Sequence, residues 1–308
     1  MLNNYIMDYN NILIMAHKRP DGDAIGSVLA MYLYLKEQGK KVSFVLDEYA
    51  KSFSFLPGIM DQKEKIEDID LVIALDTSSM DRLSHIDLFK KAKHSIGIDH
   101  HPSNTKYCDH NFVYDMEPAT CQILYYLFKE NNIDVSKEIG ICLMNGLVTD
   151  TNGFRVGNLT SKSYEMIYEL SKIGVDVKDI CNRTVVIKTK KQFSLLNRAM
   201  ERTEFFDNDR IAYTYLKRND LEELNAELGD HEGIVDMILN IEGIEVAIFL
   251  MDSDDGVIAS LRSRGNVNVA KVASIFAGGG HVSAAGFTIK MEMVELKNKL
   301  IMEIEKDL

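Results

Sequence analysis

Residues 11–39 read NILIMAHKRPDGDAIGSVLAMYLYLKEQG, and this stretch decides the fold class. Its mostly apolar start, residues 11–16, is typical of a buried strand, and residues 24–39 predict a helix that ends at a glycine. One imidazole and two carboxylates stand between them, on His17, Asp21 and Asp23. A buried strand followed by a polar turn and a helix is the building unit of a parallel α/β sheet.

The same alternation continues through the first half of the chain. Three more apolar strands are predicted, at residues 41–46, 70–75 and 95–98. Five more helices are predicted, at residues 119–132, 136–150, 160–174, 176–183 and 188–200. Continuous apolar strands that alternate with helices favour a parallel doubly wound sheet.

The second half of the chain has a different pattern. Strands are predicted at residues 210–217, 245–252 and 257–264, with the hairpin turn DSDDG (252–256) between the last two. Helices are predicted at residues 219–228, 233–240, 267–276 and 292–306. This pattern indicates a smaller α/β domain with a mixed sheet. We therefore divide the chain into a first domain (1–186), a helical linker (187–203) and a second domain (204–308).

Composition excludes several classes of protein. Hydrophobic residues make up 46% of the 308 residues, enough for a sizeable core. A net charge of −12 argues against long duplex nucleic acid as a partner, whereas a small anionic substrate suits a site where bound cations offset that charge. No apolar run approaches the ~20 residues of a membrane span. The start lacks a signal-peptide pattern and the four cysteines are scattered, so we predict a cytoplasmic protein that binds no membrane.

Acids and imidazoles recur where the predicted strands end. Besides the first cluster, the chain places Asp76, Asp99, His100, His101 and Asp150 at such positions or in the helix end GLVTDTNGFR. Any one of them alone is more often a turn former or a helix cap. Since the carboxyl ends of parallel strands share one edge of a sheet, we expect these side chains to converge there.

The converging side chains predict a metal site. Two imidazoles and four carboxylates are enough donors for two divalent ions, and unpaired carboxylates in one place would repel each other. Mixed histidine and carboxylate ligation favours Mn²⁺ over Ca²⁺, with Mg²⁺ or Co²⁺ as alternatives.

Four segments resemble, in order, the motifs of the DHH-family phosphoesterases. They are HKRPDGDAIGS (17–27), ALDTSS (74–79), GIDHHPSN (97–104) and GLVTDTNGFR (146–155). A fifth, GGGHVSAAGF (278–287), resembles the signature of the DHH-associated C-terminal domain. The resemblance covers nearly the whole chain, and within the family the chain is similar to the NrnA-type bifunctional oligoribonucleases.

The resemblance implies roles for individual residues. His17, Asp21 and Asp76 would hold one metal ion, and Asp23, Asp76, His100 and Asp150 the other, so that Asp76 bridges the two ions. Asp99 would orient an imidazole, and His101 would face the substrate phosphate. The expected catalytic set is therefore Asp76, Asp99, His100 and His101.

The second domain is expected to bind the substrate, in a cleft between the two domains. Arg262 and Arg264 alternate on one face of a predicted strand, and guanidinium groups match phosphate oxygens. Gly279, Gly280 and His281 belong to the GGGH element, whose glycines allow close backbone approach. Such arginines and glycines are more often a solvated face and a loop; the resemblance favours a phosphate-and-base grip. Arg155 is a further candidate from the first domain.

The resemblance implies a two-metal hydrolase of short nucleic acids. Expected substrates are oligonucleotides of a few residues (nanoRNA), pApA and cyclic-di-AMP, cleaved to 5′-mononucleotides, together with 3′-phosphoadenosine 5′-phosphate (pAp). A family II inorganic pyrophosphatase is an alternative that the GGGH element argues against. A non-catalytic nucleotide-binding protein is another, although all six ligand positions carry suitable residues. A homodimer is expected by family analogy alone.

Overall fold

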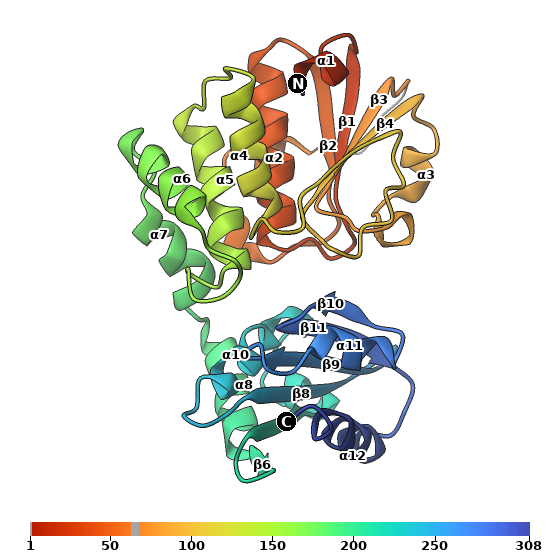
Figure 1. The fold of residues 1–308 in the computed structure, drawn as a ribbon, viewed down its shortest axis with the longest axis vertical. Helices are drawn as coiled ribbons and strands as arrows, with labels where there is room; N and C mark the ends of the chain where they lie inside the picture. Colours follow the sequence, from red (N-terminus) through yellow and green to blue (C-terminus); the bar gives the residue numbers. More distant parts are fainter. Residues whose placement is uncertain (1, 63–67) are drawn as a thin grey trace. The chain divides into compact units, whose positions relative to one another are not determined.

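The computed structural model describes residues 2–62 and 68–308 (Figure 1). The chain divides into two compact units, Met1–Ile187 and Lys188–Leu308, and each is described here by itself. The helix α8 (Lys190–Glu201), which lies in the predicted linker, is part of the second unit, where Leu195 and Ala199 are buried in its core.

A five-stranded parallel sheet forms the centre of the first unit. Its strands are β1 (Asn11–Met15), β2 (Lys41–Val45), β3 (Leu71–Leu75), β4 (His94–Asp99) and β5 (His110–Val113), in the spatial order β2-β1-β3-β4-β5. All four pairings are parallel, which confirms the fold predicted for this half. The edge strand β5 was not predicted, because its sequence HNFV is short and only half-buried.

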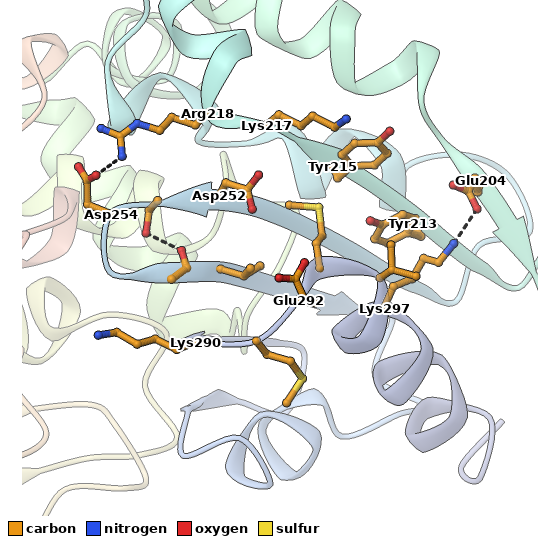
Figure 2. Close-up of a pocket in the computed structure, with 16 residues that line it drawn as sticks. Glu204, Tyr213, Tyr215, Lys217, Arg218, Asp252, Asp254, Lys290, Glu292 and Lys297 are labelled. Atoms are coloured by element: carbon orange, nitrogen blue, oxygen red, sulfur yellow. Dashed lines mark hydrogen bonds and ion pairs between the residues drawn. The ribbon is translucent and has the colours of Figure 1, made fainter.

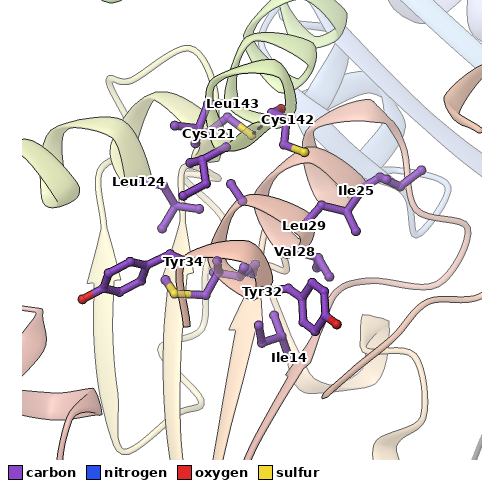
Figure 3. Close-up of a cluster of buried hydrophobic side chains, with 14 of the residues drawn as sticks. Ile14, Ile25, Val28, Leu29, Tyr32, Tyr34, Cys121, Leu124, Cys142 and Leu143 are labelled. Atoms are coloured by element: carbon purple, nitrogen blue, oxygen red, sulfur yellow. Dashed lines mark hydrogen bonds between the residues drawn. The ribbon is translucent and has the colours of Figure 1, made fainter. Parts of the chain in front are cut away.

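Helices and short helical turns lie against this sheet or pack on the helices that do. They are α1 (Asn3–Ile6), α2 (Gly22–Glu37), α3 (Ile86–Phe89), α4 (Thr120–Glu130), α5 (Lys137–Asp150), α6 (Ser161–Lys172) and α7 (Val177–Cys181), with 3₁₀ turns at Lys51–Phe53, Ile59–Asp61 and Met80–Arg82. A π-helical turn, Asn182–Val186, follows α7, so the predicted helix at 176–183 ends two residues early. Figure 3 shows the packing of α2 against α4 and α5, with Leu29, Leu124 and Leu143 in the main core.

Glycines allow α2 and α5 to cross closely. A Cβ atom on Gly26 would lie 2.4 Å from the carbonyl oxygen of Cys142, and one on Gly22 would lie 2.4 Å from the side chain of Thr149. The amide of Asn145 in turn donates to the carbonyl oxygen of Gly22 at 2.8 Å. This crossing brings the first turn of α2, which carries Asp23, next to the last turn of α5.

The second unit contains a mixed six-stranded sheet, as predicted. Its strands are β6 (Glu204–Phe206), β7 (Ile211–Leu216), β8 (Val246–Ser253), β9 (Gly256–Ser263), β10 (Gly279–His281) and β11 (Ala284–Ile289), in the order β10-β11-β9-β8-β7-β6. Only β7 and β8 pair in parallel among these described strands, and β8 and β9 form the predicted hairpin. Strands β6, β10 and β11 were not predicted.

The helices of the second unit are α8, α9 (Arg218–Glu223), α10 (Ile234–Leu239), α11 (Val269–Ser274) and α12 (Met293–Ile304), with a 3₁₀ turn at Leu228–His231. Helices α11 and α12 cover one face of the sheet, where Leu261 and Leu300 are buried. Helices α8 and α10 cover the other face, around Phe249. Within residues 2–62 and 68–308, no helix has both the length and the apolar character needed to span a membrane.

Candidate metal centre

The sheet of the first unit delivers one aspartate to the middle of the candidate site. Asp76 directly follows β3, has a backbone φ of 51°, and donates its N–H to the carbonyl oxygen of Ile98 at 3.0 Å. Aspartate tolerates this left-handed conformation better than most residues do. The sharp turn aims the carboxylate, which is almost fully buried, at the residues that follow β1 and β4.

The two oxygen atoms of Asp76 face two different histidines. Oδ2 lies 3.7 Å from Nε2 of His17, and Oδ1 lies 3.5 Å from Nε2 of His100. His17 Nε2 also lies 3.8 Å from Asp21, and His100 Nε2 lies 3.2 Å from Asp150. One carboxylate therefore stands between two separate sets of donors.

Both sets are compact. In each, one donor atom per residue lies within 4.8 Å of the others; the sets are His17, Asp21 and Asp76, and Asp23, His100 and Asp150. A third group with the same spacing joins Asp76 to Asp99 and His101. The structure thus brings together all six side chains that were predicted to hold metal ions. Their role as ligands stays a prediction.

Backbone carbonyl groups orient the two histidines. Nδ1 of His17 lies 2.8 Å from the carbonyl oxygen of Lys18, and Nδ1 of His100 lies 3.1 Å from that of Glu117. A carbonyl oxygen only accepts hydrogen bonds, so each Nδ1 carries a proton and donates it. The neutral form of each ring then presents the lone pair of Nε2 to the carboxylates, as in histidines that bind metal ions.

Asp99 holds the other histidine of the DHH motif. Its Oδ1 accepts from Nδ1 of His101 at 2.7 Å and from the backbone N–H of His100 at 2.9 Å. Its Oδ2 accepts from the side-chain amide of Asn104 at 2.7 Å. Burial acts to raise the pKa of Asp99, but these partners, His101 foremost, lower it, so the carboxylate stays ionised. Asp99 therefore contacts the ring of His101 as an ionised acceptor, and its orienting role in catalysis stays a prediction.

The remaining carboxylates are crowded. Burial, together with the negative charges of Asp76 and Asp150, raises the pKa of Asp23 well above its ordinary value. Burial is also the main cause that raises the pKa of Asp150 to about 6. For His17, burial acts to lower the pKa, but the carboxylates of Asp21 and Asp76 outweigh it and raise the pKa to about 11. Excess negative charge is thus offset by protons in the absence of a cation.

The donor sets fit divalent transition-metal ions. Around an octahedral ion with bonds of about 2.1 Å, neighbouring ligand atoms are separated by about 3 Å. The separations from His17 and His100 to the carboxylates, 3.2–3.8 Å, need only small adjustments to meet that value. Imidazole nitrogen mixed with carboxylate oxygen is the chemistry of Mn²⁺ and its neighbours in the first transition row.

The arginines predicted to bind substrate have protein partners. Arg262, in β9, forms an ion pair with Asp236 of α10 at 3.1 Å. Arg264 lies one residue beyond β9 and donates to the carbonyl oxygens of Ile244 and Leu239. The predicted strand at 257–264 is therefore one residue too long at its end, and both guanidinium groups bind to α10 or the loop after it.

Arg155 also has a local partner. It donates to the carbonyl oxygen and to the side chain of Asn152, both at 2.9 Å. These bonds close the exposed turn that follows α5, and the proposed substrate contact of Arg155 stays a prediction.

The GGGH element forms the edge strand β10 rather than a loop. Gly280 has a φ of 145°, and a Cβ atom there would lie 2.4 Å from the carbonyl oxygen of Ala284. Only glycine therefore allows the close pairing of β10 with β11 at this position. At Gly279, by contrast, a Cβ atom would meet no described atom within 4 Å. The backbone at Gly279 is therefore open to close approach, and His281 ends the same strand.

A separate concave surface of the second unit contains none of the predicted substrate-binding residues. Figure 2 shows it beside β7 and the start of α12, lined by residues that include Tyr215, Lys217, Asp252 and Lys297. Its charges are mixed, with Lys297 paired to Glu204 and Arg218 paired to Asp254.

Sequence reasoning missed the residues that hold the predicted ligands in place. Asn104 is the last residue of the segment GIDHHPSN, so its position in that motif could have indicated its contact with Asp99. Gly146, the first residue of the segment GLVTDTNGFR, gave a similar signal, since a Cβ atom there would collide with Asp23. Thr120 gave none, because its contacts with Asp23 and Asp76 join segments far apart in the chain.

Family models match both units of the chain. The model described as "DHH family, N-terminal domain" matches residues 11–147, and the DHHA1 domain model matches residues 208–307. The chain belongs to the DHH family and carries a DHHA1 domain.

Individual relatives cover nearly the whole chain. The bifunctional oligoribonuclease and PAP phosphatase NrnA of Thermus thermophilus is 29% identical over 301 residues, which is 96% of this chain and 90% of that protein. An exopolyphosphatase-related protein from Bacteroides fragilis has a similar structure, with a TM-score of 0.90, 25% identity, and coverage of 99% of this chain and 94% of that chain. RecJ from Thermus thermophilus, solved in complex with Mn²⁺, shares the fold at a TM-score of 0.59 and 11% identity, over 99% of this chain and 53% of RecJ.

Proposed function

We propose that this chain is a metal-dependent phosphodiesterase that hydrolyses short oligonucleotides to 5′-mononucleotides. The observation that carries the proposal is the placement of Asp76, whose two carboxylate oxygens face His17 at 3.7 Å and His100 at 3.5 Å. A carboxylate between two donor sets suits a pair of metal ions about 3.5–4 Å apart. The NrnA relative, at 29% identity, supports short RNA as the substrate class.

The proposed reaction is an in-line displacement at phosphorus. A water molecule attacks the phosphorus atom and gives up a proton, the bond from phosphorus to the ribose 3′ oxygen breaks, and that oxygen takes up a proton, so the net change is the addition of one water molecule across the bond. Two divalent cations, Mn²⁺ by the chemistry of the donors, supply Lewis acidity for the water and for the phosphate oxygens. Asp76 and the two donor sets would hold these cations.

The chain's own residues would hold the phosphate and the rest of the substrate. His101 is fixed through Nδ1 by the ionised Asp99, so its Nε2 is the nitrogen that can donate to a phosphate oxygen. Burial acts to lower the pKa of His101, but Asp99 and Asp76 raise it, which favours the protonated, donating form of the ring. In the second unit, the open backbone at Gly279 and the neighbouring His281 are proposed to hold another part of the substrate.

The same machinery would act on pAp. Its 3′ phosphate is a monoester on a nucleotide, and its hydrolysis also breaks a bond between phosphorus and the ribose 3′ oxygen. The NrnA relative is named for both activities, which supports pAp as a second substrate of this chain.

The proposal is tested with a substrate panel in the presence of Mn²⁺. The panel holds pApA, RNA of two to five and of twenty-four nucleotides, cyclic-di-AMP, pAp and pyrophosphate. We expect mononucleotides from the short oligomers and phosphate from pAp, and no turnover with Asp76→Ala, since that change removes the carboxylate that faces both His17 and His100.

Two results would decide against the proposal. Turnover of pyrophosphate alone would favour a pyrophosphatase. Absence of any Mn²⁺-dependent turnover on the whole panel would point to a nucleotide-binding protein without catalysis.

A further inference from the structure

Helix α4 begins without a cap of its own. Its N-cap residue, Ala119, has no side chain that could accept a hydrogen bond from the first turn. The backbone N–H groups of Thr120 and Cys121 donate instead to the two carboxylate oxygens of Asp23, at 2.6 and 2.9 Å. A predicted metal ligand, 97 residues away in the chain, therefore closes this helix end.

The same turn of α4 also reaches the central carboxylate. The hydroxyl group of Thr120 donates to Oδ1 of Asp76 at 3.0 Å, and the side chains of Thr120, Asp23 and Asp76 are all buried. One residue thus contacts a carboxylate from each part of the site, through its backbone N–H to Asp23 and through its side chain to Asp76.

The contact selects one orientation of the Asp76 carboxylate. Oδ1, which accepts from Thr120, is the oxygen that faces His100, and Oδ2 is the oxygen that faces His17. A carboxylate rotates broadly about its last side-chain bond, and each oxygen can accept more than one hydrogen bond. A donor fixed on Oδ1 therefore limits that rotation and still leaves Oδ1 able to bind a cation.

We propose that Thr120 is a positioning residue, whose hydroxyl group orients Asp76 so that each of its oxygens serves one of two metal ions. This inference rests on the proposed two-metal function. Partners that orient metal ligands in this way typically change metal affinity by about 10- to 100-fold when they are removed.

The test compares Mn²⁺ binding by the full-length wild type with Thr120→Val and Thr120→Ser. Valine has nearly the shape of threonine without the hydroxyl group, and serine keeps the hydroxyl group without the methyl group. By titration calorimetry we expect Thr120→Val to bind at least one Mn²⁺ ion roughly 10- to 100-fold more weakly. Thr120→Ser should stay within about threefold of the wild type, because its donor is retained.

Electron paramagnetic resonance adds a readout that a merely structural role would not change. In the wild type, two Mn²⁺ ions joined by one carboxylate should give an exchange-coupled signal. At Mn²⁺ concentrations that saturate the wild type, Thr120→Val should lose this coupled signal while the circular dichroism of the apoprotein is unchanged.

The outcomes separate this inference from the proposed function. If the wild type binds no pair of Mn²⁺ ions, both the proposed function and this inference are wrong. If the wild type shows the coupled signal and Thr120→Val shows it with unchanged affinity, only the role of Thr120 is overturned. Should Thr120→Val not fold, Thr120→Ala replaces it, since alanine and serine differ by the hydroxyl group alone; equal affinities in that pair would also overturn the role.

Discussion

Two buried aspartates show two ways of keeping a carboxylate inside this protein. Asp220 is neutralised by arginines, with Arg202 at 2.5 Å and Arg198 at 2.5 Å. Asp76 is as deeply buried, yet in the described part of the chain its charged neighbours are histidines and other aspartates, with no lysine or arginine ion pair. Buried charge without a fixed cation is expensive, so the site around Asp76 has the electrostatics of a place where a mobile cation binds.

The ion pairs of Asp220 with two arginines predict how the free energy of unfolding depends on this residue and on pH. Burial acts to raise the pKa of Asp220, but the bonds from Arg202, from the Lys217 backbone and from Arg198 lower it below its ordinary value. The stabilisation is therefore complete above the unfolded pKa, about 3.9, and is lost as the pH falls through the lower folded value. We expect Asp220→Asn to lower the free energy of unfolding by about 3 kcal/mol at pH 7.

Urea unfolding at pH 7, 5 and 3 measures this effect. The difference in free energy of unfolding between the wild type and Asp220→Asn should stay constant from pH 7 to 5 and narrow at pH 3, where this carboxylate takes up a proton in the unfolded chain more readily than in the folded protein. An unchanged difference at pH 3 would contradict the ion-pair explanation and leave the packing of the side chain as its cause.

At the scale of helices, the crossing of α2 and α5 positions one half of the site. A Cβ atom on Gly146 would lie 2.3 Å from Oδ1 of Asp23 and 2.3 Å from Sγ of Cys121, which is too close for such an atom to fit without displacing them. We expect Gly146→Ala to push α5 and Asp23 apart, to destabilise the protein by about 1–3 kcal/mol, and to weaken Mn²⁺ binding.

Gly140→Ala is the matched control in the same helix. Its Cβ atom would meet the ends of three aliphatic side chains at 3.0–3.2 Å, which can shift, and it would not touch the site. Thermal unfolding and Mn²⁺ titration of both variants test this explanation. If Gly140→Ala also weakens Mn²⁺ binding, any disturbance of α5 weakens it, and the collision with Asp23 is not the specific cause.

The sequence alone could predict the elements whose pattern is local. Strands β1 to β4 are apolar runs buried along most of their length, and each was predicted to within a residue or two. Strands β6 and β10 have three residues each, and β10 is rich in glycine, so their pairing depends on partners that a local pattern does not show.

The same distinction holds for the candidate site. The residues at strand ends could be predicted, because parallel strands bring their carboxyl ends to one edge. The contacts that orient them could not. The carbonyl of Glu117 on His100 and the hydroxyl of Thr120 on Asp76 arise only when segments 17 and 44 residues apart have packed together.

At the scale of the whole chain, each unit has its own buried core. The first unit encloses the clusters around Leu29 and Val72, and the second encloses those around Leu261 and Phe249. All six predicted metal ligands belong to the first unit. A ligand that binds only the folded form of one unit stabilises that unit by mass action, by about 2.7 kcal/mol for one site at a concentration of 100 times its dissociation constant.

Mn²⁺ should therefore raise the unfolding temperature of the first unit alone. In differential scanning calorimetry of the full chain, we expect two unfolding transitions. Mn²⁺ should raise the midpoint temperature of one of them, and a chelator should restore the original value. Asp220→Asn, whose side chain belongs to the second unit, assigns the other transition by lowering it, and Asp76→Ala should abolish the shift with Mn²⁺. A single transition that moves to higher temperature as a whole would mean that the two cores unfold cooperatively, so that Mn²⁺ stabilises the second unit as strongly as the first.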